Sequence, residues 1–213
     1  MRIIKPDVII IDNLSGPDIL RKIELCGRTC YKSEDKKTDT SSEQFVRNII
    51  KRGHESVLEH VNITVKFICD RGVSHEIVRH RIASYSQEST RYCDYTSGRF
   101  DCGITVIEPC FWNRGSQQYY DWEMACRKAE EAYFDLIKGG ATPQEARSVL
   151  PNSLKTEVVM TANLREWRHF LKLRTSPAAH PQIREVALIL LDKLKEKVPV
   201  VFDDIEPKEG GAK

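Results

Sequence analysis

The stretch HVNITVKFICD, residues 60–70, decides the fold class of this 213-residue chain. Its apolar side chains fall on every second position, which is typical of a strand with one buried face. Strands are also predicted over residues 8–11 and 156–160, where apolar residues again cluster. Because long helical patterns separate these few strands, the sequence predicts an α+β fold and not a doubly wound sheet.

The helical patterns consist of apolar residues three and four positions apart. They cover residues 17–26, 41–52, 74–82, 116–138, 143–150, 163–173 and 181–198. Ser41 with Gln44, and Thr142 with Glu145, have the spacing of capping boxes, which begin helices. Residues 84–98 lack apolar periodicity and are rich in hydroxyl groups, so we expect an ordered loop there.

Composition and charge restrict the class of protein. Apolar residues make up 40% of the chain and charged residues 30%, and 33 Lys and Arg against 31 Asp and Glu give a net charge of +2. These values argue against disorder and against a basic surface for nucleic acid. Since no linker interrupts the pattern, we expect one domain over residues 1–205 and a frayed tail over 206–213. Residues 1–12 do not resemble a signal peptide and no apolar run could cross a membrane, so we expect a cytoplasmic protein without a membrane partner.

The seven cysteines are odd in number and show no paired CxxC spacing. Neither a disulfide framework nor a four-cysteine zinc site is therefore expected, and reduced thiols with structural roles are predicted. Cys26 and Cys30 could share one helix face, but two ligands without a second pair do not make a metal site.

Polar side chains are densest in RHRIASYSQESTRY, residues 79–92. Arginine presents a planar fork of donors that matches phosphate oxygens, and serine and threonine hydroxyls can complete such a site. The stretch favours anion recognition, with an ordinary solvated surface as the alternative. A second cluster, NLREWRHFLKLR at residues 163–174, places Arg165 and His169 four positions apart on one helix face, where they could meet one ligand or face solvent.

The stretch HESVLEH, residues 54–60, offers two histidines and two glutamates. A helical zinc site needs histidines at i and i+4, whereas His54 and His60 are six apart. We therefore expect a capped turn or contacts with an organic ligand here, and no metal site. A metal-dependent hydrolase centred on these residues, which would lose activity with a chelator, ranks last among the functions considered. The chain has neither GxGxxG nor GxxxxGK[ST], so any nucleotide is expected to be held largely by side chains.

The first cluster is more specific than its composition indicates, because RHR at residues 79–81 is followed after seven residues by Ser89. This pattern resembles the signature of the flavin-dependent thymidylate synthases. Three more stretches lie in the order and spacing of that family: GHESVLEH at 53–60, ARSVLP at 146–151 and ANLREWRHFLKLR at 162–174. The resemblance covers roughly residues 40–195 and makes a solvated surface the weaker interpretation.

The resemblance implies a compact α+β unit with a mixed sheet packed against helices, assembled as a homotetramer with active sites at subunit interfaces. It implies reductive methylation of dUMP to dTMP, with methylenetetrahydrofolate as carbon donor and tetrahydrofolate as the second product. FAD would carry the hydride and NADPH would reduce FAD. Ordinary thymidylate synthases use a cysteine nucleophile, but none of the seven cysteines falls at a position that this family requires.

The family's dUMP contacts fall on two stretches and two single arginines. They are Glu76, Ile77, Val78, Arg79, Gln87, Glu88, Ser89, Thr90, Arg91, Arg147 and Arg174. A phosphate dianion needs charged, forked donors and hydroxyls, and Arg91, Arg147 and Ser89 supply them. Arg174 is expected to be catalytic, since a fixed cation at the pyrimidine edge stabilises the electron-rich form of uracil that reacts through C5.

The family's FAD contacts fall on nine positions, two of which are shared with dUMP. They are Ser56, Arg79, His80, Arg81, Gln87, Asn163, Leu164, Arg165 and His169. The arginines and His80 suit the pyrophosphate and the electron-rich flavin edge, while the flavin carries the redox step. By the same resemblance, Glu59 would orient the substrate or an arginine, and His54 would lie near the entrance for folate or NADPH.

The chain departs from the family pattern in three places. Position 76, often Gln, is Glu76 here, and position 87, often Glu, is Gln87. After Arg174 the family often has a His four residues on and a Gln two later, whereas this chain has Ala178 and His180. The contacts near these positions are therefore open, while Arg174 and the main signature are unaffected.

A protein that binds RNA or nucleotides without catalysis is the alternative from another class. Tyr85, Tyr92 and Tyr95 interleave with Arg91 and Arg99 and could stack bases. The nearly neutral net charge argues against this alternative, and a copurifying yellow chromophore would distinguish a flavoenzyme from it.

Overall fold

The computed structural model describes residues 1–207, with the side chain of Arg99 excepted. Residues 208–213, and with them most of the tail predicted over 206–213, lie outside the described part. The chain folds into two compact units, each made of three segments. The first unit holds residues 1–7, 67–79 and 85–159, and the second holds residues 8–66, 80–84 and those from 160 onward. That residues 1–205 act as one domain stays a prediction.

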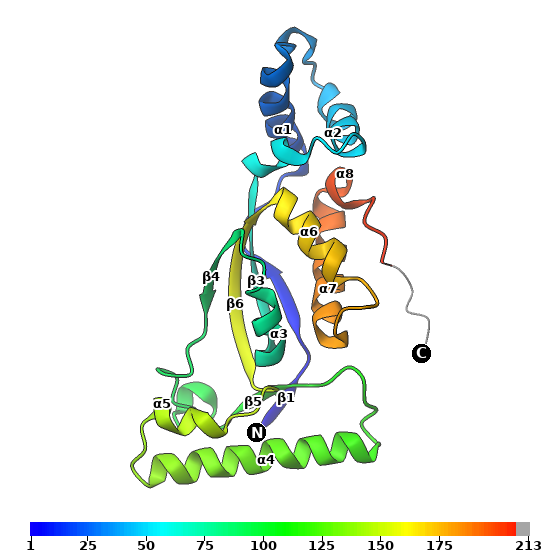
Figure 1. Cartoon of the computed structure of the whole chain (residues 1–213). Coiled ribbons are helices and arrows are strands. Elements are labelled where there is room, and N and C mark those ends of the chain that lie inside the picture. Colours follow the sequence, from blue (N-terminus) through cyan, green and yellow to red (C-terminus); the bar gives the residue numbers. More distant parts are fainter. Residues whose placement is uncertain (208–213) are drawn as a thin grey trace. The chain divides into compact units, whose positions relative to one another are not determined.

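The main sheet has four strands in the order β2-β3-β6-β4, so β3 and β6 are its central pair (Figure 1). The strands are β2 (Asp7–Ile10), β3 (Asn62–Asp70), β4 (Ala83–Gln87) and β6 (Lys155–Asn163). Along β3 and β6, buried side chains alternate with less buried ones, because successive residues of a strand point to opposite faces. The prediction of these two strands and of an α+β fold is confirmed. The chain passes from one unit to the other within each strand, so each unit contains part of the sheet.

The first unit packs its core against the long helix α4, Gln117–Lys138. The side chain of Ser116 begins this helix by accepting a hydrogen bond from the backbone N–H of Tyr119. Strands β1 and β5 pair in parallel beside the core residues Ile104 and Val106. The other elements of the unit are β1 (Arg2–Ile4), α3 (Arg71–Ile77), η3 (Gly98–Phe100), β5 (Thr105–Ile107), α5 (Pro143–Ala146) and η4 (Arg147–Val149). The predicted capping box of Thr142 and Glu145 is present at the start of α5.

The second unit is mainly helical. Its helices are α1 (Gly16–Tyr31), η1 (Glu34–Lys36), α2 (Ser41–Lys51), η2 (Glu55–His60), α6 (Leu164–Arg174), α7 (Pro181–Lys197) and α8 (Pro199–Phe202). Helix α6 is fixed to the sheet by the buried Trp167, whose indole N–H donates to the carbonyl of Ile63 at 3.0 Å. The predicted apolar stripe of α7 is buried throughout, so α6 and α7 share one core.

Two predictions around the RHR motif are wrong, for physical reasons. The helix expected over 74–82 is α3, which begins earlier because the Asp70 carboxylate accepts the N–H of Val73 at 2.6 Å, and ends at Ile77. Residues 79–82 therefore lie outside the helix. The loop expected over 84–98 begins with strand β4, which lies at the sheet edge and exposes most of its side chains. The sequence of β4 therefore lacks the apolar alternation that would have predicted a strand.

A third prediction, the capping box of Ser41 and Gln44, is also wrong. Ser41 is the first helical residue of α2, and Thr40 stands at the cap position. The Ser41 hydroxyl donates to the buried carboxylate of Glu24 at 2.6 Å. This carboxylate also accepts from Arg28, so Ser41 joins α2 to α1 instead of capping its own helix.

All seven cysteines are free thiols. Within residues 1–207, no helix combines the length and the apolar character needed to cross a membrane.

Candidate functional site

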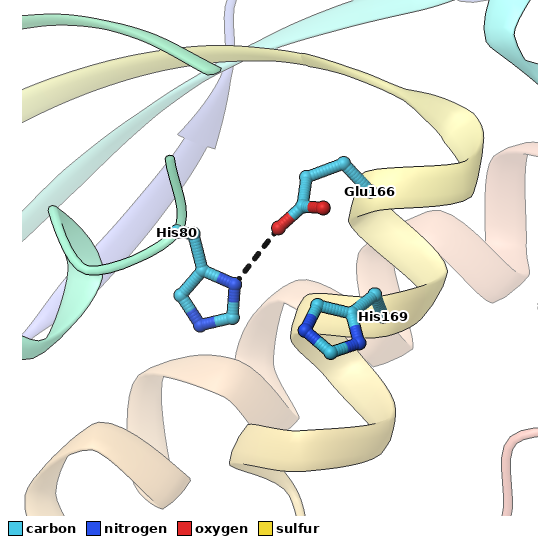
Figure 2. A group of neighbouring side chains, drawn as sticks. All are labelled: His80, Glu166 and His169. Atoms are coloured by element: carbon cyan, nitrogen blue, oxygen red, sulfur yellow. Dashed lines mark hydrogen bonds and ion pairs between the residues drawn. The ribbon is translucent and has the colours of Figure 1, made fainter. Parts of the chain in front are cut away.

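The start of helix α6 places three polar side chains on one side of the second unit. Asn163 stands at the cap position, and its side-chain oxygen accepts the backbone N–H of Glu166 at 2.9 Å. Glu166 and His169 are three residues apart and therefore lie on the same helix face (Figure 2). His80, from the segment that precedes β4, reaches this face from outside the helix.

His80 is held between two charged groups. Its Nδ1 lies 2.9 Å from the Oε1 of Glu166 (Figure 2), and its Nε2 accepts from the Nε of Arg174 at 3.1 Å. Both His80 and Glu166 are buried, with 5% and 7% of their surface exposed. An arginine N–H can only donate, so Nε2 is the acceptor and the imidazole proton lies on Nδ1, which donates to the Glu166 carboxylate.

Burial lowers the pKa of His80 below its ordinary value of 6.5. The hydrogen bond to Glu166 acts in the opposite direction, and the positive charge of Arg174 lowers the pKa further. The rings of His169 and Phe170 lie 5.6 Å and 4.8 Å from the His80 ring. His80 is thus neutral at neutral pH, as the tautomer argument requires.

Within residues 1–207, His80, Glu166 and His169 are the group whose potential ligand atoms gather for a metal, all within 4.8 Å of one another. His54 and His60, the pair expected to bind zinc in the hydrolase alternative, are not part of it. Because Arg174 donates to Nε2 of His80, the proton lies on Nδ1, and the nitrogen that faces Glu166 has no lone pair to offer a cation. The arrangement therefore favours an oriented arginine over a metal ion, and the expectation of no metal stays a prediction.

A cavity of about 620 Å³ opens beside this cluster. Its lining residues are Glu55, Glu59, Ile82, Asn163, Arg165, Glu166, His169 and Lys172. The volume is in the range of sites for organic cofactors. Arg165 and Lys172 bring positive charge, the amide of Asn163 and the carboxylates can bind hydroxyls, and Ile82 presents an apolar side chain that is 69% exposed. This set of groups suits a ligand with phosphate, sugar and aromatic parts.

The expected FAD contacts in the second unit have different surroundings. Arg165 is exposed at the cavity and pairs with Glu59 at 2.6 Å, and the expectation that Glu59 orients the substrate or an arginine stays a prediction. Leu164 is fully buried, and its N–H donates to the carbonyl of Val61, so its side chain serves the core. Ser56 and Arg81 are exposed.

His54, expected near the entrance for folate or NADPH, is exposed at the start of η2. Its Nδ1 lies 3.1 Å from the hydroxyl of Tyr31, the last residue of α1. This contact joins two helical elements of the second unit at an exposed position.

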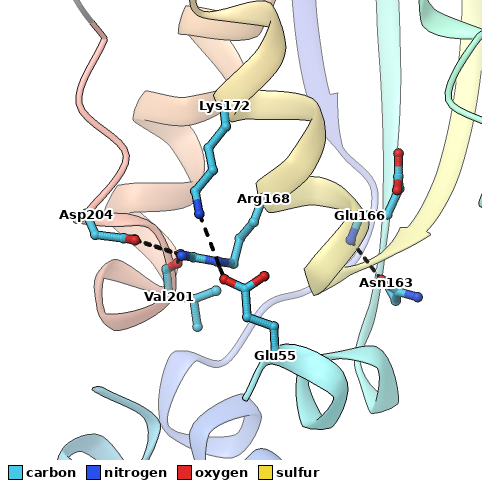
Figure 3. A network of polar contacts seen from close by, with 7 residues as sticks. All are labelled: Glu55, Asn163, Glu166, Arg168, Lys172, Val201 and Asp204. Atoms are coloured by element: carbon cyan, nitrogen blue, oxygen red, sulfur yellow. Dashed lines mark hydrogen bonds and ion pairs between the residues drawn. The ribbon is translucent and has the colours of Figure 1, made fainter. Parts of the chain in front are cut away.

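Arg168, on the same helix, is used by the fold. It is 1% exposed, and its Nε donates to Glu55 at 3.1 Å while its two terminal nitrogens donate to Asp204 at 2.6 and 2.7 Å (Figure 3). One terminal nitrogen also donates to the carbonyl of Val201. Burial would raise the pKa of Asp204, but the hydrogen bonds from Arg168 together with the positive charges of Arg168 and Lys172 outweigh it and lower that pKa below 3.8. This network fastens the chain around residues 201–204 to α6.

The first unit contains the expected dUMP contacts of residues 87–91, beginning with Gln87 and Glu88. The Gln87 amide donates to Ser74 at 3.0 Å and to Thr156 at 3.3 Å. Glu88 accepts from Lys155 at 2.9 Å and from the hydroxyl of Tyr95 at 3.3 Å. Both side chains therefore hold the end of β4 in place.

The next residues are oriented toward one another. The Ser89 hydroxyl accepts the N–H of Arg91 at 3.3 Å, and the buried Thr90 hydroxyl lies 3.5 Å from a terminal nitrogen of Arg147. The exposed Arg91 guanidinium packs over the ring of Tyr92, 5.5 Å from its centre. The first unit thus contains two local contacts among the expected phosphate donors: the Ser89 hydroxyl with the backbone N–H of Arg91, and the Thr90 hydroxyl with Arg147.

The remaining expected dUMP contacts in the first unit are residues 76–79. The Ile77 side chain is fully buried, and its carbonyl accepts the hydroxyl of Tyr85 at 3.0 Å. Val78 and Arg79 are exposed, and Glu76 is half-buried.

The expected FAD contacts and the expected dUMP contacts each include residues of both units. Arg79 and Gln87 belong to the first unit and the other FAD contacts to the second, whereas Arg174 is the dUMP contact that belongs to the second.

Sequence reasoning missed three residues of the second unit that line the cavity: Ile82, Glu166 and Lys172. A fourth lining residue, Glu55, lies in the HESVLEH stretch, for which the sequence predicts a capped turn or contacts with an organic ligand. Glu166 could have been predicted, because it precedes His169 by three positions on a predicted helix and therefore lies on the same helix face. Ile82 could not have been predicted, since its exposure depends on α3 ending at Ile77.

The structure weakens the RNA-binding alternative. Tyr95, one of the three expected stacking residues, is 3% exposed and packs against Phe100 and Tyr133 in the core. The side chain of Arg99 lies outside the described part. Tyr92 is exposed, but one exposed ring does not make a stacking platform for successive bases.

Comparison with known proteins identifies relatives along nearly the whole chain. Residues 10–200 match the family model of the thymidylate synthase complementing protein, Thy1. A flavin-dependent thymidylate synthase of Geobacter sulfurreducens is 34% identical over 198 residues, covering 90% of this chain and 84% of that protein. One from Pyrococcus furiosus is 33% identical over 186 residues, covering 87% of this chain and 73% of that protein.

A solved structure has the same fold. It is the crystal structure of the UMP/dUMP methylase PolB from Streptomyces cacaoi bound with 5-Br dUMP. The TM-score is 0.78, with 24% sequence identity, and the match covers 95% of this chain and 96% of that one. This likeness supports the mixed α+β architecture.

Proposed function

Because the chain belongs to the flavin-dependent thymidylate synthase family, we propose that it converts dUMP to dTMP by reductive methylation. The proposed carbon donor is methylenetetrahydrofolate, which leaves as tetrahydrofolate. The proposed flavin is FAD, with NADPH as its reductant. The proposed working form is a cytoplasmic homotetramer with active sites shared between subunits.

One observation carries the proposal: the hydrogen bond from the Nε of Arg174 to the Nε2 of His80. His80 is the middle residue of the RHR motif, whereas Arg174 ends the NLREWRHFLKLR helix. The resemblance assigns the first to the flavin and the second to the uracil. Their direct contact is what a reaction between these two ligands needs, because reacting groups must be held together in a fixed geometry.

The cavity in the second unit fits a flavin nucleotide by the chemistry of its lining. Arg165 and Lys172 would bind the pyrophosphate, and Asn163 would bind hydroxyl or amide groups. Ile82 would cover an aromatic ring, since its side chain is apolar and exposed. When bound, the flavin supplies the hydride, and the protein contributes placement and charge.

The first unit would hold the phosphate of dUMP. Arg91 and Arg147 supply charge and forked donors, and Ser89 supplies a hydroxyl. Thr90 is buried beneath Arg147, so its hydroxyl would orient that arginine. Gln87 and Glu88 are engaged inside the unit, and we propose that they act by holding this loop in place.

Arg174 would act on the pyrimidine. The C5 of uracil is a weak nucleophile, and negative charge on the ring makes it stronger. A fixed guanidinium at the pyrimidine edge would stabilise that charge as it develops. A neutral His80 orients the guanidinium without offsetting its charge.

The proposal is tested by purifying the protein with FAD, reducing it anaerobically with NADPH, and adding dUMP with methylenetetrahydrofolate. Flavin absorbance and dTMP are followed together. We expect flavin reoxidation that depends on both substrates and yields one dTMP per flavin oxidised. Folded, FAD-loaded protein that oxidises its flavin without forming dTMP would overturn the proposed reaction.

A further inference from the structure

We propose that Glu166 is a positioning residue: it fixes the tautomer of His80, and His80 in turn holds the guanidinium of Arg174. The inference rests on the proposed function and goes beyond it by adding a residue that lines the cavity and acts through His80, to which it is hydrogen-bonded. Glu166 was not among the residues that the family resemblance indicated. The contact that assigns it is the 2.9 Å hydrogen bond between its Oε1 and the Nδ1 of His80.

We call the chain of contacts from Glu166 through His80 to Arg174 the relay. It depends on which nitrogen of His80 carries the proton. With the proton on Nδ1, the imidazole donates to Glu166 and accepts from Arg174, so both contacts are satisfied. With the proton on Nε2, two N–H groups would face each other at Arg174, and the Glu166 carboxylate would face a lone pair. A hydrogen bond to a carboxylate is about twice as strong as a neutral one, so Glu166 selects the first tautomer.

Burial makes this selection effective. His80 and Glu166 are both more than nine-tenths buried, so water cannot readily replace either partner. A mispaired group in this position would lose its hydrogen bond without compensation from water. Most of the His80 population is therefore held in the tautomer that accepts from Arg174.

The fold holds Glu166 firmly. Its backbone N–H is bound by the Asn163 cap, and the next residue, Trp167, is anchored to Ile63. Glu166 lies in the first turn of an 11-residue helix, where the helix dipole stabilises a carboxylate. These contacts hold the carboxylate facing His80 (Figure 2).

The charged and titratable groups that face His80 are Glu166, His169 and Arg174. Among them, Glu166 favours protonation of His80, whereas Arg174 and His169 oppose it. Removing the Glu166 charge should therefore make His80 harder to protonate. This gives the relay a signature in the pH profile that loss of packing would not produce.

The experiment compares Glu166→Gln, His80→Gln and the double variant in the FAD-loaded, full-length protein. Glu166→Gln keeps the shape but loses the charge, and its amide can also donate to Nδ1 and so favour the wrong tautomer. Glu166→Ala serves as a second variant, and Glu43→Gln, an exposed glutamate of the same unit, is the matched control. Flavin absorbance and thermal unfolding show which variants are folded and loaded.

Three measurements test the relay. A proton–nitrogen correlation spectrum of protein labelled with 15N-histidine reports the His80 tautomer. The signal that is missing from the spectrum of the His80→Gln variant is assigned to His80. We expect the proton on Nδ1 in the parent protein and a mixture in Glu166→Gln. For Glu166→Gln we expect kcat to fall by about 10-fold to 10²-fold, with the KM for dUMP nearly unchanged. In the pH profile of kcat, we expect the acid limb to move to lower pH. In the His80→Gln background, Glu166→Gln should add less than about 2-fold.

The outcomes separate the two proposals. A tautomer that depends on Glu166, in protein that forms no dTMP, would keep the relay and overturn the proposed reaction. Formation of dTMP with tautomer, kcat and pH profile unchanged in Glu166→Gln would overturn the relay. Equal losses from Glu166→Gln in both backgrounds would also overturn it, because Glu166 would then not act through His80. Stoichiometric zinc in the purified protein, lost in Glu166→Gln, would replace the relay with a metal site.

Discussion

Two arginines of helix α6, Arg168 and Arg174, are six residues apart and have different partners. Arg168 is almost fully buried and donates to two carboxylates and a carbonyl, so its charge is offset within the fold. Arg174 is half-buried, and its Nε donates to His80, a neutral partner. A neutral acceptor orients a cation without offsetting its charge, whereas carboxylates do both. The comparison teaches that an arginine enclosed by carboxylates stabilises the fold, whereas an arginine whose Nε is held by a neutral imidazole is oriented by that contact.

The largest effect is expected from Arg174→Ala. We expect kcat for dTMP formation to fall by about 10²-fold to 10³-fold, as for the loss of one preorganised donor to developing charge. The midpoint of thermal unfolding should change little, because Arg174 is half-buried. Arg174→Lys keeps a charge but lacks the forked group and should recover only part of the rate. A large fall in unfolding temperature with normal kcat in the folded fraction would contradict the assignment and make Arg174 resemble Arg168.

Arg168→Ala should have the opposite profile. Its loss leaves the carboxylates of Glu55 and Asp204 without their main cation, and breaking a buried pair costs about 3–5 kcal/mol. Because both carboxylates retain some access to water, we expect about 3 kcal/mol in the free energy of unfolding. Denaturant unfolding measures this change. The control is Arg127→Ala, whose pair with Glu123 is partly exposed and should contribute less than about 1 kcal/mol. Equal losses in both variants would show that the buried network is no stronger than an exposed pair.

The sequence predicted the parts of the fold that have a clear period. Strands β3 and β6 alternate, and helices α4, α6 and α7 carry apolar stripes, so each was found near its actual bounds. β1 and β5 have only three residues each, which is too short for a period to be seen. The edge strand β4 exposes most of its side chains and resembles a loop.

The candidate site was predictable in its residue types but not in its pairing. The family resemblance named His80 and His169 as flavin contacts and Arg174 as a dUMP contact, yet the hydrogen bond between His80 and Arg174 depends on the chain leaving α3 at Ile77. The apolar pattern reveals neither the Asp70 cap, which begins this helix earlier than predicted, nor the end of the helix at Ile77. Arg168 and Arg174 look alike in the sequence, because only the fold brings Asp204 to one and His80 to the other.

Arg147→Ala extends the comparison to the first unit, with a smaller expected effect. Arg147 is exposed, and its terminal nitrogen lies 3.5 Å from the Thr90 hydroxyl, so it is oriented by a neutral partner as Arg174 is. We expect the KM for dUMP to rise by about 10-fold with a small change in kcat, since a phosphate contact binds substrate and transition state alike. Steady-state kinetics at constant ionic strength measures this split. Arg127→Ala again serves as the control, and a fall in kcat with unchanged KM would place Arg147 away from the phosphate.

The smallest effect concerns the pH dependence of stability, which should differ between the two arginine regions. The pKa of His80 is lowered in the folded protein, so below its ordinary value of 6.5 the unfolded chain binds the proton first. The contribution of the His80 region to the free energy of unfolding is therefore fully present above pH 6.5, and it is lost as the pH falls through the folded pKa of His80. The pKa of Asp204 is lowered below 3.8, so the Arg168 region keeps its stability to lower pH and loses it only below 3.8. Denaturant unfolding from pH 8 to 5 should thus show a fall in stability that His80→Gln removes and Asp204→Asn leaves in place. If Asp204→Asn removed that fall and His80→Gln did not, the assignment of a neutral His80 beside Arg174 would be wrong.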